Sequence, residues 1–157
     1  MGTTRWRLCA LSLLLASGVL SACATSSPTL YERINTKDAT GTLRGGRDAI
    51  RLIVDDFVAN AVADPVAGPR FKAIPAAEVE GLKSKLADQI CEATGGPCSY
   101  YGRTMKETHA GMKITEAEWN ATVAALVKAL DKHKIAAREK DELLAALGPM
   151  KKDIVGQ

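Results

Sequence analysis

The stretch MKETHAGMKIT, residues 105–115, contains one of only two histidines in a chain of 157 residues. Gly111 follows His109 by two positions and can take a positive φ angle, which would end a short helix at low cost. Thr115 and Glu118 form the Thr-x-x-Glu pattern of a capping box, which predicts the start of a long helix. A lone histidine in such a segment is more often an ordinary polar residue than a ligand, so both interpretations of His109 stay open at this point.

The surroundings of His109 favour a ligand. Residues 94–114 contain at most a helical turn and a half, and a loop that long in a compact domain is usually functional or supported by a bound component. Met105, Met112 and Ile114 would expose apolar surface if nothing covered them. Neither a nucleophile motif nor a zinc motif such as HExxH accompanies the histidine. A neutral imidazole facing an apolar pocket can instead bind haem iron, because the porphyrin supplies four of the ligands.

Helical periodicity dominates the remaining sequence, and no segment predicts a strand. Apolar residues between positions 50 and 61 recur at intervals of three and four, as on the buried face of one helix. Pro65 ends that helix, since the residue before a proline is pushed out of helical geometry. Helices are expected at residues 30–34, from 47 to 64, from about 76 to 94, from 115 past 130, and from about 136 to 147. Residues 35–46 and 65–75 are expected to be irregular.

The N-terminal residues have the layout of a secretory signal. Arg5 and Arg7 precede the apolar run LCALSLLLASGVL, which is too short for a confident membrane span. The run ends in LSAC, residues 20–23, which resembles the lipobox of bacterial lipoproteins, where the signal is removed before a cysteine that becomes acylated. The alternative is a general signal that is cleaved near Ala22 and leaves Cys23 as a free thiol.

The lipobox interpretation divides the chain into a signal peptide at residues 1–22, a lipid-anchored tether at 23–29 and one domain at 30–157. Acyl chains would hold that domain at a membrane of the bacterial cell envelope, on the periplasmic or outer face, without a spanning helix. All 18 acidic residues lie beyond Cys23, whereas two of the 21 basic residues lie in the signal, so the remainder has 19 bases and an excess of one positive charge. No basic stripe with interleaved aromatic residues appears, which argues against nucleic acid as a partner.

Two further cysteines and the second histidine complete the set of reactive side chains. Cys91 and Cys98 flank the turn sequence EATGGP, and outside the cytoplasm such a pair can oxidise. Two cysteines without a nearby histidine or second pair are too few for a zinc site. The alternatives are a disulfide and two free thiols, which a thiol count on unreduced, denatured protein separates. His133 lies among charged residues at a helix end and is assigned no chemistry.

Several segments together resemble a group I truncated haemoglobin, and the resemblance covers residues 29–157. The similar segments are TLYERI, GGRDAIRLIVDDFVANAVADP, ATGGP, YGRTMKETHAGMKIT and LLAALGPMKKDIV. They include the paired glycines of the family at 45–46 and 95–96 and its MKxxHxG pattern around the proximal histidine. The resemblance implies an all-α truncated globin, a two-over-two helical sandwich around one haem b (iron protoporphyrin IX), with His109 as the proximal iron ligand.

The resemblance also implies which residues contact the haem. The expected set is Phe57, Val58, Phe71, Leu82, Lys85, Leu86, Met105 and Met112. Lys85 would pair with a haem propionate, or would reach the iron side as a donor or sixth ligand. Val58 and Leu86 stand where many members carry a tyrosine or histidine and a glutamine. Those polar groups hydrogen-bond bound O2, so the chain is expected to bind O2 more weakly than members that have them.

Three functions follow as alternatives. The first is reversible binding of O2 or another diatomic gas (NO or CO) at the cell envelope, serving for example a membrane oxidase. The second is an enzyme activity, oxidation of nitric oxide to nitrate, which needs an external reductase because the chain has no flavin or nicotinamide domain. The third is a haem-free helical lipoprotein, which a missing Soret band after growth with added haem would indicate.

Overall fold

The computed structural model describes residues 27–157, so the predicted signal peptide and Cys23 lie outside the described residues. The helices are α1 (Leu30–Arg33), α2 (Gly46–Ala63), α3 (Gly68–Lys72), α4 (Val79–Ala93), α5 (Met105–His109), α6 (Glu116–Lys132) and α7 (Ala137–Leu147), with short 3-10 helices η1 (Ala76–Glu78) and η2 (Gly148–Asp153). A hairpin of β1 (Asn35–Lys37) and β2 (Leu43–Gly45) joins α1 to α2. Across residues 27–157, no helix is long and apolar enough to span a membrane.

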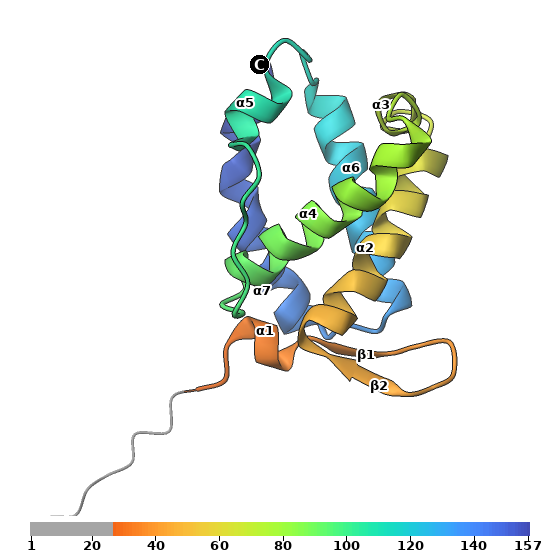
Figure 1. The fold of residues 1–157 in the computed structure, drawn as a ribbon, viewed down its shortest axis with the longest axis vertical. Helices are drawn as coiled ribbons and strands as arrows, with labels where there is room; N and C mark the ends of the chain where they lie inside the picture. The colour runs from red at the N-terminus through yellow and green to blue at the C-terminus, as the bar shows by residue number, and fades with distance from the viewer. Residues whose placement is uncertain (1–26) are drawn as a thin grey trace, which may run out of the picture.

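The long helices form two crossed pairs. Helices α2 and α4 pack on each other in one layer, and α6 and α7 lie behind them (Figure 1). The predicted apolar face of α2 is buried: Ala49, Ile50, Ile53, Val54, Phe57, Val58 and Ala61. Each of the larger side chains of this face (valine, isoleucine or phenylalanine) stabilises the fold by about 1.5–3 kcal/mol when fully buried. The expected all-α, two-over-two helical sandwich is therefore confirmed.

The hairpin contradicts the expectation that residues 35–46 would be irregular. Its turn is held by Asp38, whose Oδ1 accepts hydrogen bonds from the backbone N–H groups of Thr40 and Thr42 at 2.9 and 3.0 Å. Hydrogen bonds from the Thr40 hydroxyl and from Arg44 hold the pKa of Asp38 at about 2. Strands of three residues are too short to produce a readable alternation, so their pairing depends on this turn rather than on a hydrophobic pattern.

Helix α3 is a second departure from prediction, since residues 65–75 were expected to be irregular. Asp64 begins this region by accepting N–H hydrogen bonds from Val66 and Ala67 at 2.8 and 2.9 Å. Gly68 then packs against the end of α2, where an added Cβ would lie 2.7 Å from the carbonyl oxygen of Val62. Side-chain capping and a close backbone approach thus produce a helical turn that apolar periodicity does not reveal.

The turn after α4 is closed by covalent and steric contacts. Cys91 and Cys98 form a disulfide across the GGP turn. Gly95 has a φ of 81°, and Gly96 leaves no space for a side chain, because a Cβ there would lie 2.5 Å from the ring of Tyr31 and 2.6 Å from the sulfur of Cys91. The glycine pair is therefore needed where α1, α4 and the disulfide meet.

Gly96→Ala is expected to lower the free energy of unfolding by about 1–3 kcal/mol, the usual cost of adding atoms to a closely packed site. Gly81→Ala is the matched control, because Gly81 lies on the exposed side of α4 and an added Cβ meets nothing within 4 Å. The control should be neutral or stabilising, since alanine favours helix over glycine by about 1 kcal/mol. Urea unfolding of both variants measures the difference; equal effects would contradict the steric explanation.

Candidate functional site

His109 is the last residue of α5, a helix of only five residues. Its Nδ1 lies 2.8 Å from the carbonyl oxygen of Met105, one turn earlier in the same helix. A carbonyl can only accept, so Nδ1 carries the proton and Nε2 presents its lone pair. Among residues 27–157, no side chain or backbone group hydrogen-bonds Nε2. The half-buried imidazole is therefore oriented with one nitrogen fixed and the other open to a ligand.

Helix α5 is too short to be stable alone, so its position depends on its ends. At the start, Thr104 and Glu107 form a capping box, with the Thr104 N–H and hydroxyl 2.9 and 2.8 Å from the Glu107 carboxylate. At the end, Gly111 turns the chain with a φ of 77°, as predicted from the sequence. Ile114 then pairs with Val155 in an isolated parallel bridge near the C-terminal end of the chain. These contacts fix the helix that carries His109.

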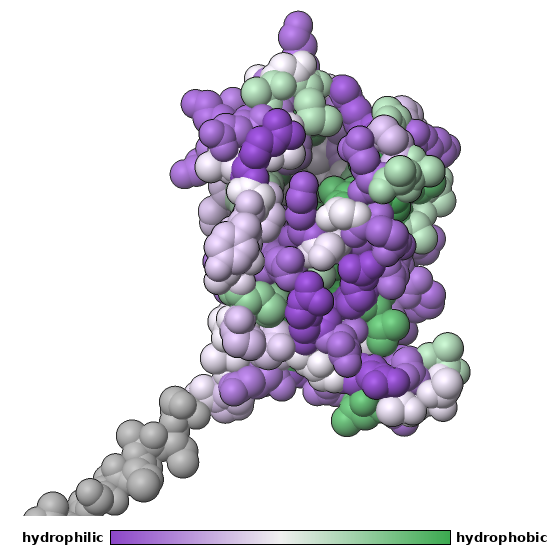
Figure 2. All heavy atoms as spheres, in the orientation of Figure 1, coloured by the Kyte–Doolittle hydropathy of each residue, from purple (hydrophilic) through white to green (hydrophobic). Residues whose placement is uncertain are grey.

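A recess lies beside α5. The space-filling view in Figure 2 shows the surface hollowed between α4, α5 and the beginning of α6. Several apolar residues on these elements and the following loop are half-buried without packing against the main core: Leu82, Met105, Met112, Trp119 and Val123. Apolar surface left uncovered on several elements around one histidine suits a large, flat, apolar group.

The remaining predicted contact residues lie on α2, α3 and α4. Phe57 and Phe71 meet edge to face, with ring centroids 6.2 Å apart and an interplanar angle of 81°. Phe71 and Leu86 pack on the core from its margin, whereas Val58 is itself a core residue with 4% of its surface exposed. Lys85 is exposed on α4, one turn from Leu82. The predicted residues thus lie on α2, α3, α4 and α5 and in the loop after α5. Leu82, Met105 and Met112 are the ones beside the recess, whereas Phe57, Val58, Phe71 and Leu86 belong to the main core or pack against it.

Gln89 is a residue that the sequence analysis missed. Its side-chain amide lies 3.4 Å from the sulfur of Met105, a contact that joins α4 directly to the helix of His109. The sequence spacing could have indicated that Gln89 lies near the site. It follows Leu86 by three and Lys85 by four positions and therefore lies on the same side of the helix. The capping box at Thr104 was equally readable, since it has the same Thr-x-x-Glu pattern that identified Thr115.

The predicted capping box at Thr115 is present and also joins two helices. The N–H and hydroxyl of Thr115 lie 2.8 and 2.9 Å from the Glu118 carboxylate, and Arg70 of α3 donates to the same carboxylate at 2.6 Å. The hydrogen bond from Arg70, together with those from Thr115, holds the pKa of Glu118 at about 2. One carboxylate thus fixes the start of α6 and joins α3 to it.

Glu118→Gln is expected to destabilise the domain at neutral pH and to lose this effect in acid. Because the folded-state pKa of about 2 lies below the ordinary value of 4.5, the ionised group stabilises the fold fully above pH 4.5, and this contribution falls as the pH approaches 2. Urea unfolding at pH 7 and at steps from pH 4.5 to 3 measures the difference between wild type and variant. A difference that does not shrink in acid would contradict this origin.

His133, which was assigned no chemistry, holds the hairpin to the helices. Its Nε2 lies 2.7 Å from the carboxylate of Asp56 in α2, and its Nδ1 lies 3.0 Å from the hydroxyl of Thr36 in β1. Burial opposes ionisation of Asp56, but hydrogen bonds from Lys132 and His133 keep its pKa below the ordinary value. Both ring nitrogens of His133 are thereby occupied, in contrast to His109.

Two crossed helix pairs and a short helix that presents one histidine beside a recess define a small globin of the two-over-two type. The chain belongs to the bacterial-like globin family, which it matches over residues 42–155. It is similar to the group 1 truncated haemoglobin GlbN of Mycolicibacterium paratuberculosis, with 28% identity over 110 residues, 70% of this chain and 79% of that protein. GlbN of a Nostoc species is 27% identical over 129 residues, 82% of this chain and 98% of that protein.

Solved structures show the same fold. The truncated haemoglobin of Tetrahymena pyriformis in its Fe(III) form superposes with a TM-score of 0.71 at 23% identity, over 83% of this chain and all of that one. The 2/2 haemoglobin of a Synechococcus species, in the cyanomet state with covalently attached haem, gives 0.68 at 22% identity, over 82% of this chain and 98% of that one. The matched family region begins at residue 42, so β1 lies before it.

Proposed function

We propose that this globin binds haem b through the Nε2 atom of His109 and reversibly binds a diatomic gas, O2, NO or CO. The observation that supports the proposal is the hydrogen bond from Nδ1 of His109 to the Met105 carbonyl. It leaves Nε2 unprotonated, with its lone pair available to a metal beside an apolar recess. Haem would supply an iron that takes four ligands from the porphyrin and can bind a diatomic gas. The names of the relatives agree with this assignment.

The surrounding residues have distinct tasks in this proposal. Met105 and Met112 would cover the histidine side of the group, while Leu82, Leu86 and Phe71 would cover the gas side. Phe57 and Val58 would form the wall behind the gas, and the exposed Lys85 would pair with a propionate at the edge. The side chains proposed for the gas side are apolar, so with Lys85 at a propionate bound O2 would have no hydrogen-bond donor. The proposal therefore includes weak retention of O2.

The same proposal places the protein at a membrane of the cell envelope. Its basis is the LSAC sequence, in which Cys23 would carry the acyl chains and residues 24–29 would form a tether. A gas-binding domain at that surface would serve a membrane oxidase or a reductase partner rather than bulk storage.

Absorption spectra of the purified full-length protein test the proposal. We expect a Soret band in the ferric and ferrous forms and a shifted band after addition of CO, after growth with added haem. Protein that folds but shows no Soret band would indicate the haem-free alternative. Oxidation of NO to nitrate remains the second function, and it requires sustained turnover when NO, O2 and a reductase are supplied together.

A further inference from the structure

The point where the chain enters the domain is held rigidly. Thr29 caps α1 by hydrogen-bonding Glu32, and the N–H of Tyr31 donates to the carbonyl of Thr94 at 2.9 Å. Arg33 donates to the carbonyl of Pro28 at 2.7 Å and pairs with Glu139 and Glu142 of α7. The residues just after the proposed tether therefore cannot swing freely against the helices.

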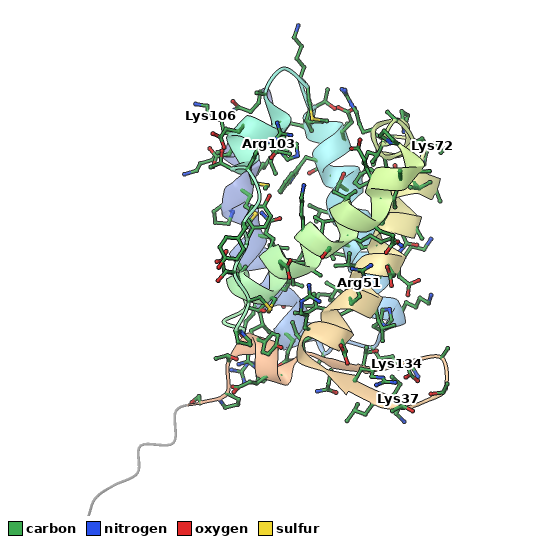
Figure 3. All side chains as sticks on the ribbon, viewed as in Figure 1. Lys37, Arg51, Lys72, Arg103, Lys106 and Lys134 are labelled. Carbon is green, nitrogen blue, oxygen red and sulfur yellow. A yellow bond between two sulfur atoms is a disulfide. The ribbon has the colours of Figure 1, made fainter. Side chains whose placement is uncertain are left out.

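The hairpin projects beside this entry point, and α5 lies at the opposite end of the molecule (Figure 1). Lys37 and Lys134 lie together at the hairpin end, whereas Arg103 and Lys106 lie at the α5 end (Figure 3). Leu43 of β2 is 64% exposed, which is unusual for a large aliphatic residue on this domain. The hairpin end thus combines cationic side chains with an exposed aliphatic one.

A groove of about 660 Å³ runs between the hairpin, α2 and the end of α6. Its acidic residues are already occupied: Asp38 pairs with Arg44, Asp55 with Lys83, and Asp56 with Lys132 and His133. Among residues 27–157, no carboxylate pairs with Lys37 or Lys134, and both lysines are exposed. Lys134 also has a φ of 55°, which turns the chain away from α6 at the rim of the groove. The groove therefore presents two free ammonium groups.

The tether is short compared with the domain. Five residues lie between Cys23 and Thr29, which gives six steps along the chain, and a fully extended chain covers at most about 3.3–3.6 Å per step, or roughly 20 Å. Helix α6 alone, with 17 residues, is about 25 Å long at 1.5 Å per residue. An acylated Cys23 would therefore keep the entry end, and not the α5 end, against the lipid surface.

We propose that the hairpin end, defined by Lys37, Leu43 and Lys134, docks on the anionic phospholipid headgroups of the membrane to which Cys23 is anchored. The two ammonium groups bind lipid phosphates, and Leu43 inserts between the headgroups. His133 holds the hairpin to α2 and α6, so docking sets the orientation of the whole domain. The recess beside His109 then faces away from the membrane. This inference rests on the proposed lipid anchor.

The proposed interaction is electrostatic, and its effect on the docking equilibrium can be estimated. A lysine near an anionic membrane surface strengthens binding about fivefold, and the effect declines within a Debye length of about 10 Å at 0.1 M salt. Two lysines give a combined effect of roughly 25-fold on the docking equilibrium. Because the tether already holds the domain close, this moderate attraction is sufficient to select one orientation.

Spin labels on the acylated full-length protein test the orientation. Ala39 in the hairpin turn and Ala117 at the opposite end of α6 are both exposed, so Ala39→Cys and Ala117→Cys are matched labelling sites. The proteins are reconstituted in vesicles of phosphatidylglycerol and phosphatidylethanolamine, and collision with a water-soluble nickel complex is measured. We expect the label at position 39 to be protected at the headgroup level and the label at 117 to be fully accessible.

Charge variants and a second lipid composition test whether electrostatic attraction causes the protection of the label at position 39. Lys37→Glu combined with Lys134→Glu should remove the protection at position 39, whereas Lys72→Glu combined with Lys106→Glu should leave it unchanged. Vesicles of phosphatidylcholine alone should also abolish it. Flotation of the vesicles reports the anchor separately: protein that floats while both labels are equally accessible overturns the docking but keeps the anchor. Protein that does not float with the vesicles overturns both the anchor and the docking. Protection of position 39 that does not depend on lipid charge indicates that something other than anionic headgroups covers the hairpin end, and it overturns the proposal.

Discussion

His109→Ala is expected to weaken haem binding more than about 100-fold, beyond the 10–100-fold loss that follows removal of a group that merely supports a metal ligand. The variant removes the imidazole whose Nδ1 hydrogen-bonds the Met105 carbonyl and whose Nε2 is the proposed iron ligand. Haem titration of the variant followed at the Soret band measures the loss. The ferrous spectrum of any retained haem should differ from wild type, because the axial nitrogen is absent.

His133→Gln is the control, since it alters the other histidine of the chain and leaves α5 intact. It should destabilise the hairpin contacts with Asp56 and Thr36 but keep the spectrum. Addition of imidazole to His109→Gly should restore a wild-type-like spectrum, because the free ligand can occupy the vacated volume. Retained haem with an unchanged ferrous spectrum in His109→Ala would overturn the ligand assignment.

Val58→Tyr is expected to slow O2 release by about 10- to 150-fold. Bound O2 carries partial negative charge, and a hydrogen bond to a charged group is worth roughly 1.5–3 kcal/mol. Release of CO should change far less, because bound CO is less polar. Stopped-flow displacement of O2 by CO measures the first rate, and displacement of CO by NO measures the second.

The size of tyrosine requires a separate control at this position. Val58 is a core residue, so any larger side chain will displace its neighbours. Val58→Phe introduces nearly the same volume without the hydroxyl, and it should leave O2 release fast. Equal slowing of O2 release by both substitutions would show that crowding, and not a hydrogen bond, is responsible.

Local patterns predicted the parts of the fold that depend on local interactions. The buried face of α2 and the start of α6 at Thr115 follow from spacing in the sequence alone. The end of α5 near Gly111, which has a φ of 77°, follows in the same way. These features required only the geometry of a helix and the chemistry of its ends.

Features that join distant segments could not be predicted in the same way. The β-bridge joins Ile114 to Val155, which lie 41 positions apart, and a hydrogen bond joins His133 to Asp56, which lie 77 positions apart. No sequence pattern around these residues indicates which distant residue each one contacts. The hairpin was missed because its strands are short, and α3 because Asp64 and Gly68 produce it rather than an apolar period. Predicting such contacts requires knowledge of how the helices pack.

The pairing of Ile114 with Val155 has a practical consequence for anyone who handles this protein. The N–H of Lys113 donates to the carbonyl of Gln157 at 2.5 Å, and that of Gly156 donates to Ile114 at 2.9 Å. The final residues are thus structural neighbours of the helix that carries His109. An affinity tag or fluorescent fusion joined to Gln157 would pull on that helix, and a protease that trims the last few residues would release it.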